Sequence, residues 1–163
     1  MKIRSVVFFA AMALSVSLAH ADEAQPWQSP DWEPIAEAER QPATEAEIEQ
    51  VTLAAKSTDE GMSYLTGGFG VAERAWLAEA GADFPLRLEF SRGARGEFVS
   101  DVQVRLTHSA GEPVFQAGSD GPLMYVDLPD GRYAGEASFR GETRSFSVDV
   151  PARGQVHAHV NFP

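Results

Sequence analysis

The chain has 163 residues, of which 24 are Asp or Glu and 13 are Lys or Arg, and it contains no cysteine. The net charge of −11 opposes binding to nucleic acid and to anionic lipid, because both would repel the protein. The lack of cysteine excludes disulfides, thiolate metal sites and catalysis by a thiol.

The first 21 residues have the pattern of a secretory signal peptide. Lys2 and Arg4 precede an apolar run over 6–18, and residues 19–21, Ala-His-Ala, match the small-x-small pattern before a cleavage site. The run is short for a membrane span, which needs about 20 residues. We therefore expect export to the periplasm, cleavage after Ala21, and no membrane span in the mature chain. Without the leader, 11 basic residues would face 24 acidic ones, a net charge of −13.

Residues 22–60 form an acidic arm rich in Glu, Ala, Gln and Pro. Its four prolines before residue 43 disfavour regular structure, so this part is expected to be extended or disordered. Thr44 and Glu47 match a capping box, and a weak apolar stripe follows. The sequence therefore predicts a short helix over 44–56.

Residues 61–83 predict a Gly-rich turn followed by a short helix over 71–80, with Gly81 as its C-cap. The three glycines in 67–70 could in principle let backbone N–H groups approach a phosphate. No Lys-Ser or Lys-Thr follows them, and no βαβ pattern leads into them. We therefore interpret these glycines as a turn, and we expect no cofactor.

All three tryptophans lie before residue 84. Tryptophan in a polar segment often belongs to a contact surface, because it buries a large area at low entropic cost. We expect Trp76, on the predicted helix, to pack on its own domain. For Trp27 and Trp32, in the acidic arm, two interpretations stay open: they cover the protein's own sheet, or they contact a partner.

Residues 84–163 switch to a period of two, in which apolar and polar residues alternate. Five runs alternate, 84–90, 102–106, 133–139, 146–150 and 156–162; 114–115 is a short apolar run and 123–128 is mostly apolar, which makes about seven predicted strands. Short turn signals separate them, and no long helix intervenes. The sequence therefore predicts an all-β fold, an antiparallel sandwich of about seven strands.

The stretch VDLPDGRY, residues 126–133, lies between two of these runs. Pro129 fixes φ for entry into a turn, and Asp130 with Gly131 can supply a positive φ. A calcium loop would need more oxygen ligands than Asp127 and Asp130 provide. We therefore predict a structural hairpin turn at Pro129, Asp130 and Gly131.

The same stretch carries a family resemblance. Its L-P-x-G-x-Y motif and the alternating strand after it resemble the carboxypeptidase regulatory-like, or transthyretin-like, β-sandwich. Residues 66–162 are also similar to a group of small exported proteobacterial proteins of unassigned function. The residues that carry the two resemblances are Gly67, Gly68, Gly70, Leu86, Leu88, Phe90, Ser119, Asp120, Gly121, Pro122, Leu128, Pro129, Gly131 and Tyr133. The resemblance implies an Ig-like or transthyretin-like fold and an exported protein, and it implies no activity.

His157 and His159 form the one H-x-H pattern of the chain, on a predicted strand. Side chains two apart leave the same face of a strand, so the two imidazoles could share a Cu(II) or Zn(II) ion. A third ligand would be needed, and His108 or Asp149 could supply it. The alternative interpretation is a pair of solvent-facing histidines.

Catalytic motifs are missing from the sequence. No serine lies in a G-x-S-x-G elbow, and the carboxylates are too many for any pair to be singled out. We therefore expect no enzyme; a periplasmic hydrolase is the weakest of the hypotheses. The first hypothesis is a non-catalytic periplasmic module that binds an envelope protein or peptide, for example by strand addition at a sheet edge. The alternative is a small periplasmic metal-binding protein that uses the two histidines of the H-x-H pattern.

Overall fold

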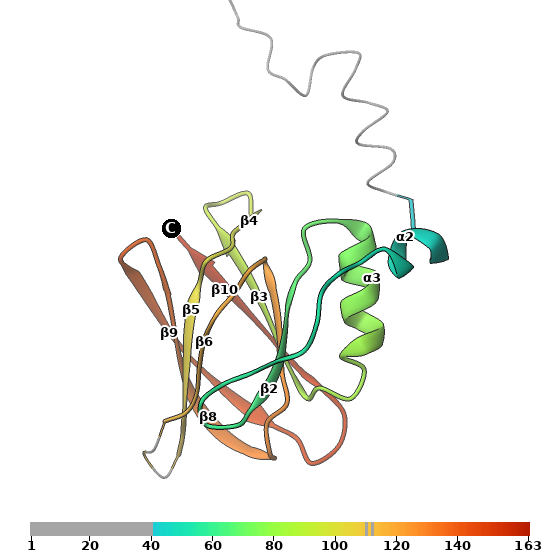
Figure 1. Cartoon of the computed structure of the whole chain (residues 1–163). Coiled ribbons are helices and arrows are strands. Elements are labelled where there is room, and N and C mark those ends of the chain that lie inside the picture. The colour runs from blue at the N-terminus through green and yellow to red at the C-terminus, as the bar shows by residue number, and fades with distance from the viewer. Residues whose placement is uncertain (1–40, 110, 112) are drawn as a thin grey trace, which may run out of the picture.

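The computed structural model describes residues 41–109, 111 and 113–163, which form two facing β-sheets and two short helices (Figure 1). The predicted signal peptide, Trp27 and Trp32 lie outside the described residues. Neither described helix is long and apolar enough to cross a membrane.

Each of these predicted strands coincides with an observed strand, so the prediction of an all-β sandwich is confirmed. Three strands, β1, β2 and β4, were not predicted. The helices are α2 (Glu45–Glu49) and α3 (Val71–Ala80); the strands are β1 (Lys56–Ser57), β2 (Ser63–Gly67), β3 (Leu86–Arg92), β4 (Glu97–Phe98), β5 (Gln103–His108), β6 (Pro113–Gly118), β7 (Leu123–Val126), β8 (Gly131–Phe139), β9 (Glu142–Val150) and β10 (Val156–Phe162).

The first sheet has the strand order β1-β2-β7-β3-β10, and β4 pairs with the end of β3; the second sheet has the order β6-β5-β8-β9. All pairs are antiparallel except β3 with β10, where Val156 lies opposite Leu86 and Phe162 opposite Arg92 in a parallel register. The predicted antiparallel arrangement is wrong at this one pair. The chain returns from β9 in the second sheet, and this crossover delivers β10 in the same direction as β3.

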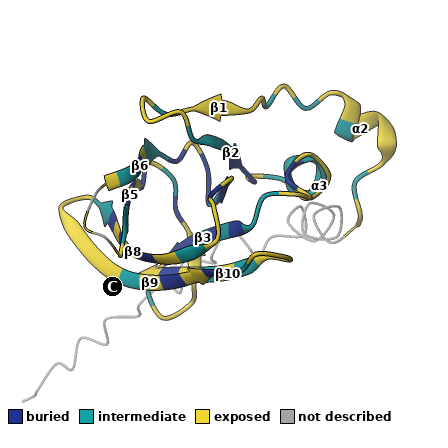
Figure 2. Cartoon of the chain, turned by 90° about the horizontal axis from the view of Figure 1, so that it is seen from below, coloured by how far each residue is buried: buried dark blue, intermediate teal, exposed yellow. Residues whose placement is uncertain are grey.

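The core lies between the sheets and is filled from alternate positions of the facing strands (Figure 2). The first sheet contributes Leu88 and Phe90, and the second contributes Val104, Leu106 and Phe115, all at most 1 % exposed. A fully buried side chain of this kind stabilises the fold by about 1.5–3 kcal/mol. The alternation therefore holds the two sheets together, as the sequence predicts.

Helix α3 covers the outer face of the first sheet. Its Leu77 is fully buried against Leu65 of β2 and Tyr125 of β7, and Trp76 packs partly buried beside them. The expectation that Trp76 packs on its own domain is confirmed. The helix ends at Gly81, as predicted, but with φ of −99°. Glycine is needed here because a Cβ would lie 2.5 Å from the Tyr125 ring.

Helix α2 begins at the predicted capping box but is shorter than the predicted 44–56. The Thr44 backbone N–H donates to the Glu47 carboxylate at 2.8 Å, and the Glu47 N–H donates to the Thr44 hydroxyl at 3.4 Å. The helix then ends at Glu49. Leu53, beyond the end of the helix, packs against the cluster of Leu65, Leu77 and Tyr125. Farther along the chain, β1 pairs with β2. A short isolated helix is only marginally stable, so these tertiary contacts override the weak local pattern.

The prediction of a hairpin at VDLPDGRY is wrong, although the chain does turn there. Strand β7 belongs to the first sheet and β8 to the second, so the segment crosses between sheets. Gly131 has φ of 152°, which glycine tolerates. The Tyr133 hydroxyl donates to the Pro129 carbonyl at 2.9 Å, the kind of bond that anchors a tyrosine corner in β-sandwiches. The motif therefore stabilises a connection between the two sheets rather than a hairpin within one sheet.

Candidate binding surfaces

The two histidines of the H-x-H pattern leave β10 on its exposed face, as predicted. The parallel register places His157 opposite Arg87 and His159 opposite Glu89 on β3. Both histidines are exposed, and the His159 side chain is 53 % accessible. The outer face of the β3–β10 pair is therefore a polar surface at the edge of the first sheet, where β10 is the last strand.

His159 is held by a hydrogen-bond network. Its Nε2 lies 2.6 Å from the Ser91 hydroxyl oxygen, and that hydroxyl donates to the Asn161 side-chain oxygen at 2.8 Å. A hydroxyl has one proton, so with this proton on Asn161 the His159 Nε2–H donates to Ser91. The network orients the imidazole without metal or ligand.

No described group of three or more His, Asp or Glu residues lies close enough together to hold a metal ion. Of the two suggested third ligands, His108 lies on β5 and packs edge-on against Tyr133 at 5.3 Å, and Asp149 lies on β9 and pairs with Arg132 at 2.7 Å. Both belong to the second sheet. The carboxylate that does approach the pair is Glu89, 3.8 Å from His159.

Ser91, His159 and Glu89 are chemically the members of a catalytic triad, but they are not arranged as one. In a triad the carboxylate orients one ring nitrogen and the serine faces the other. Here Ser91 and Glu89 both approach Nε2 of His159. Ser91 is also only 1 % exposed, so a substrate could not reach its hydroxyl.

A hollow of about 360 Å³ lies on this outer face and is lined by residues of β3, β7 and β10. Its lining residues are Arg87, Leu88, Glu89, Leu123, Tyr125, His157, Ala158 and His159. The Arg87 guanidinium stacks on the Tyr125 ring, 4.5 Å from its centroid, and donates to the Gly81 carbonyl at 3.2 Å. Its buried Nε has no hydrogen-bond partner. We call this hollow the β10 groove; it offers apolar walls, a cation and two imidazoles.

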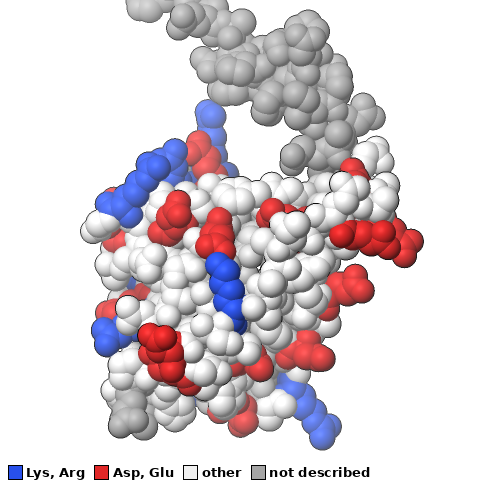
Figure 3. Space-filling view, in the orientation of Figure 1, with Lys and Arg blue, Asp and Glu red and all other residues white. Residues whose placement is uncertain are grey.

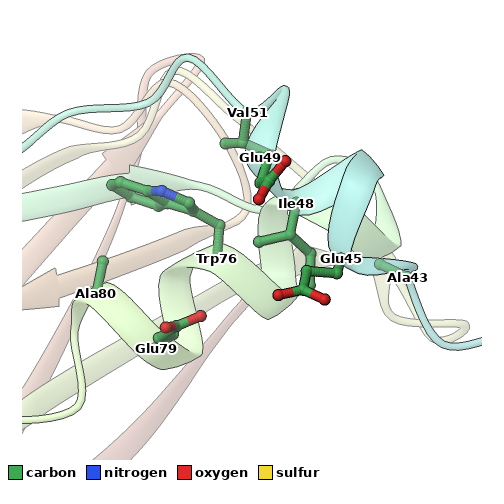
Figure 4. Close-up of a pocket in the computed structure, with 8 residues that line it drawn as sticks. All are labelled: Ala43, Glu45, Ile48, Glu49, Val51, Trp76, Glu79 and Ala80. Carbon is green, nitrogen blue, oxygen red and sulfur yellow. The ribbon is translucent and has the colours of Figure 1, made fainter.

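A second hollow, of about 700 Å³, lies between α2 and α3 (Figure 4). Trp76, Ile48 and Val51 supply apolar wall, and the carboxylates of Glu45, Glu49 and Glu79 surround them. Ala43 and Ala80 complete the lining. We call this hollow the α2–α3 groove. Its lining carries three acidic residues and no basic one, so it repels anions.

The Gly-rich loop before α3 is not an anion site. The backbone N–H groups of Gly68 and Phe69 donate to the Glu73 carboxylate at 2.8 and 3.0 Å. A phosphate would need those same donors. Glu73 therefore closes the loop onto the first turn of α3, which supports the interpretation of the glycines as a turn.

The edges of the two sheets differ in how they are protected. Natural sheets protect edges by short strands, prolines, irregular pairing or charges. Among the described strands, β1 has two residues, β6 begins at Pro113 and pairs irregularly near Thr107, and β9 carries Glu142, Arg144 and Asp149. Strand β10, VHAHVNF, has seven residues with no proline and no Asp, Glu, Lys or Arg. Of these four strands, β10 is the one whose own sequence carries none of these devices.

The backbone of β10 faces outward at alternate residues. The Val156 N–H donates to the Pro85 carbonyl at 2.8 Å, and the Phe162 carbonyl accepts from Gly93 at 2.7 Å, so residues of this parity face β3. The backbone groups of His157, His159 and Asn161 therefore face the free edge. These residues are the donors and acceptors available to another strand.

Sequence reasoning found the two histidines but missed Arg87, Glu89 and Tyr125. Arg87 and Glu89 occupy the polar positions of a predicted alternating run, which marks them as outward-facing. The pairing of β3 with β10 joins segments distant in the chain, and no local pattern encodes it. The sequence therefore predicted which side chains face outward, but it did not predict which strands lie side by side.

No family model and no curated protein matches this sequence. Two solved structures are similar in backbone: the Bacillus anthracis TIE protein, at 13 % identity and a TM-score of 0.38 over 47 % of this chain and 16 % of that chain, and S.CueP, at 15 % identity and a TM-score of 0.37 over 80 % of this chain and 96 % of that chain. The match therefore spans less than a fifth of the TIE protein. These similarities are too distant to carry a functional argument.

Proposed function

We propose that this chain is a non-catalytic periplasmic β-sandwich that binds an extended segment of an envelope protein along the free edge of β10. The observation that carries this proposal is the contrast among sheet edges. Three of the four described edge strands carry a protecting device of their own, and β10 carries none. An extended segment could add to β10 as a further strand, with main-chain hydrogen bonds providing affinity.

The β10 groove supports the proposal by offering selectivity next to the edge. Alternate side chains of an added strand would lie beside His157 and His159, within reach of the hollow. Within the described part of the chain, Arg87 makes one hydrogen bond, to the Gly81 carbonyl, although a guanidinium has five donors. A partner side chain with oxygen acceptors would complement it.

Export and family membership belong to the same proposal. The leader pattern over 1–21 supports a periplasmic location. The two-sheet architecture and the Tyr133–Pro129 bond support a place among the carboxypeptidase regulatory-like, or transthyretin-like, sandwiches that the L-P-x-G-x-Y motif resembles. The alternative of a metal-binding protein gains no third ligand among the described residues.

The direct experiment is capture from envelope extract at physiological salt, with the tagged chain lacking 1–21 as bait. The variant His157→Pro removes an edge-facing N–H, whereas His157→Ala removes the imidazole and keeps the N–H. One lost hydrogen bond of about 1 kcal/mol weakens binding about fivefold. We expect His157→Pro to reduce capture and His157→Ala to retain it.

Thermal unfolding of both variants checks that the sandwich is intact, because the altered N–H faces away from β3. Equal capture by wild type and His157→Pro would contradict strand addition. Recovery of no envelope protein would contradict the function as a binding module.

A further inference from the structure

Two exposed phenylalanines share one hollow at an end of the sandwich. Phe69, in the loop before α3, is 58 % exposed, and Phe98, on β4, is 48 % exposed; they are the large apolar residues that stand most exposed in the described part of the chain. Both line a hollow of about 260 Å³, completed by Arg92, Val99, Ser100, Asp101, Phe139 and Arg140. We call it the Phe–Arg hollow. Exposed aromatic surface of this kind is typical of a contact site.

Backbone geometry singles out the same hollow. Asp101, with φ of 59°, and Arg140, with φ of 50°, are the non-glycine residues with positive φ among those described, and both line it. Such conformations are uncommon outside glycine and gather at functional sites. Arg140 also lies in the tight turn between β8 and β9, with its guanidinium 5.1 Å from the Phe139 ring.

The charge of the hollow is opposite to that of most of the surface. Arg74 stacks over Phe98 at 5.1 Å, and Arg92 and Arg140 line the hollow. Against these three arginines stand Asp101 in the lining and Glu97, which pairs with Arg92 at 3.1 Å. Figure 3 shows several Lys and Arg side chains at the upper left of the view and several Asp and Glu side chains at the right, with both signs also present elsewhere on this face.

The chain itself contains a segment of matching chemistry. Residues 22–40 carry six Asp or Glu and one basic residue, Arg40, together with Trp27 and Trp32. An acidic segment is repelled by the α2–α3 groove, whose lining has three Glu and no cation. It is attracted to arginines, and a tryptophan can stack on Phe or Arg surfaces.

The linker length permits this contact. Residue 41, where the described chain begins, lies nine positions after Trp32. At about 3.3 Å per residue this stretch spans about 30 Å. A folded domain of about 100 residues has a radius of gyration of about 13 Å, so the segment can reach across it. In Figure 1, α2 and β4 both lie toward the upper end of the molecule.

We propose that residues 22–40 of the same chain dock in the Phe–Arg hollow, with Trp27 or Trp32 against Phe69 and Phe98 and their neighbouring acids against the arginines. This contact is independent of the β10 edge, and it assigns the arm tryptophans to the protein's own sandwich rather than to a partner. The acidic arm then shields the exposed aromatic end of the sandwich.

Photo-crosslinking tests the contact in the chain from Asp22 onward. We replace Phe98 by the photo-reactive p-benzoylphenylalanine, irradiate, and map the linked peptides by mass spectrometry. The matched control places the same group at Ala80, in the α2–α3 groove. We expect linkage from position 98 to a peptide within 22–40 of the same chain, in a yield independent of protein concentration, and little linkage from position 80.

Tryptophan quenching supplies a second measurement that leaves the fold intact. In a Trp76→Phe background, emission reports only Trp27 and Trp32. We expect acrylamide to quench them more strongly after Phe69→Ser or Arg140→Ser, or at high salt, and Glu79→Gln to have no such effect. Unchanged quenching, linkage from position 80 instead of 98, linkage between chains, or no linkage to 22–40 would each overturn the proposal.

Discussion

The Tyr133 hydroxyl makes one identifiable contribution to stability, and Tyr133→Phe isolates it. Only the hydroxyl is lost, because the ring stays in the core, where the residue is 2 % exposed. The Pro129 carbonyl that accepts its bond belongs to an exposed residue and can turn to water. The cost is therefore the net value of one hydrogen bond, about 1 kcal/mol, without the penalty of a buried unpaired acceptor. For a domain of this size, about 1 kcal/mol lowers Tm by about 4 °C.

The assay is urea and thermal unfolding of wild type, Tyr133→Phe and a control, Tyr64→Phe. Tyr64 packs edge-on against Phe115 at 5.5 Å, and its hydroxyl has no described hydrogen bond, so the control should be near neutral. The slope of the urea transition should not change. Equal stability of the two variants would refute the reasoning that the Tyr133–Pro129 bond anchors the crossing between sheets.

The same variant has a signature at alkaline pH. Burial, and then the charge of Asp130, raise the pKa of Tyr133 above its ordinary value of about 10. The folded state therefore favours the neutral phenol, and this stabilisation is present below the unfolded pKa and is lost as pH rises through the folded pKa. The stability difference between wild type and Tyr133→Phe should shrink above about pH 10. A difference that stays constant would contradict this assignment.

Three further outcomes are expected. Gly121→Ala should unfold the domain or destabilise it severely, because a Cβ would lie 2.3 Å from the Gly67 carbonyl oxygen. The control Gly70→Ala, with open space around the added Cβ, should lower the free energy of unfolding by less than about 1 kcal/mol in a urea titration. Leu77→Ala should cost about 2–5 kcal/mol, measured in the same way, because the side chain is fully buried under α3; a cost below about 1 kcal/mol would show that α3 is not anchored there. Zinc titration by calorimetry should give the same weak heats for wild type and for the chain with both β10 histidines changed to alanine, and saturable one-to-one binding lost in that variant would contradict the described geometry.

The fold was predictable where a local pattern reports on burial. The positions Leu86, Val104 and Val160 were assigned inward by alternation alone, and each is at most 4 % exposed. The α3 limits followed from periodicity and Gly81. Strand β2 was missed because SYLTG has no clear alternation, and its pairing with β7 supplies the order that the sequence does not.

The sites were harder to predict because they depend on pairings between distant segments. The two β10 histidines were found, but Glu89 joins them only through the parallel register with β3. Phe98 is apolar, and nothing in the local sequence indicates that it stands exposed on the two-residue strand β4. Local sequence therefore located the strands, and the topology decided which side chains meet.

The parallel pairing of β3 with β10 has a consequence for how the protein is made. Strand β3 keeps an open side along all seven residues until β10, synthesised after the entire second sheet, comes to lie beside it. Closure of contacts so distant in sequence is slow, because the loop entropy is lost before the contacts form. The domain therefore stays incompletely folded during synthesis until its last strand, β10, has been made.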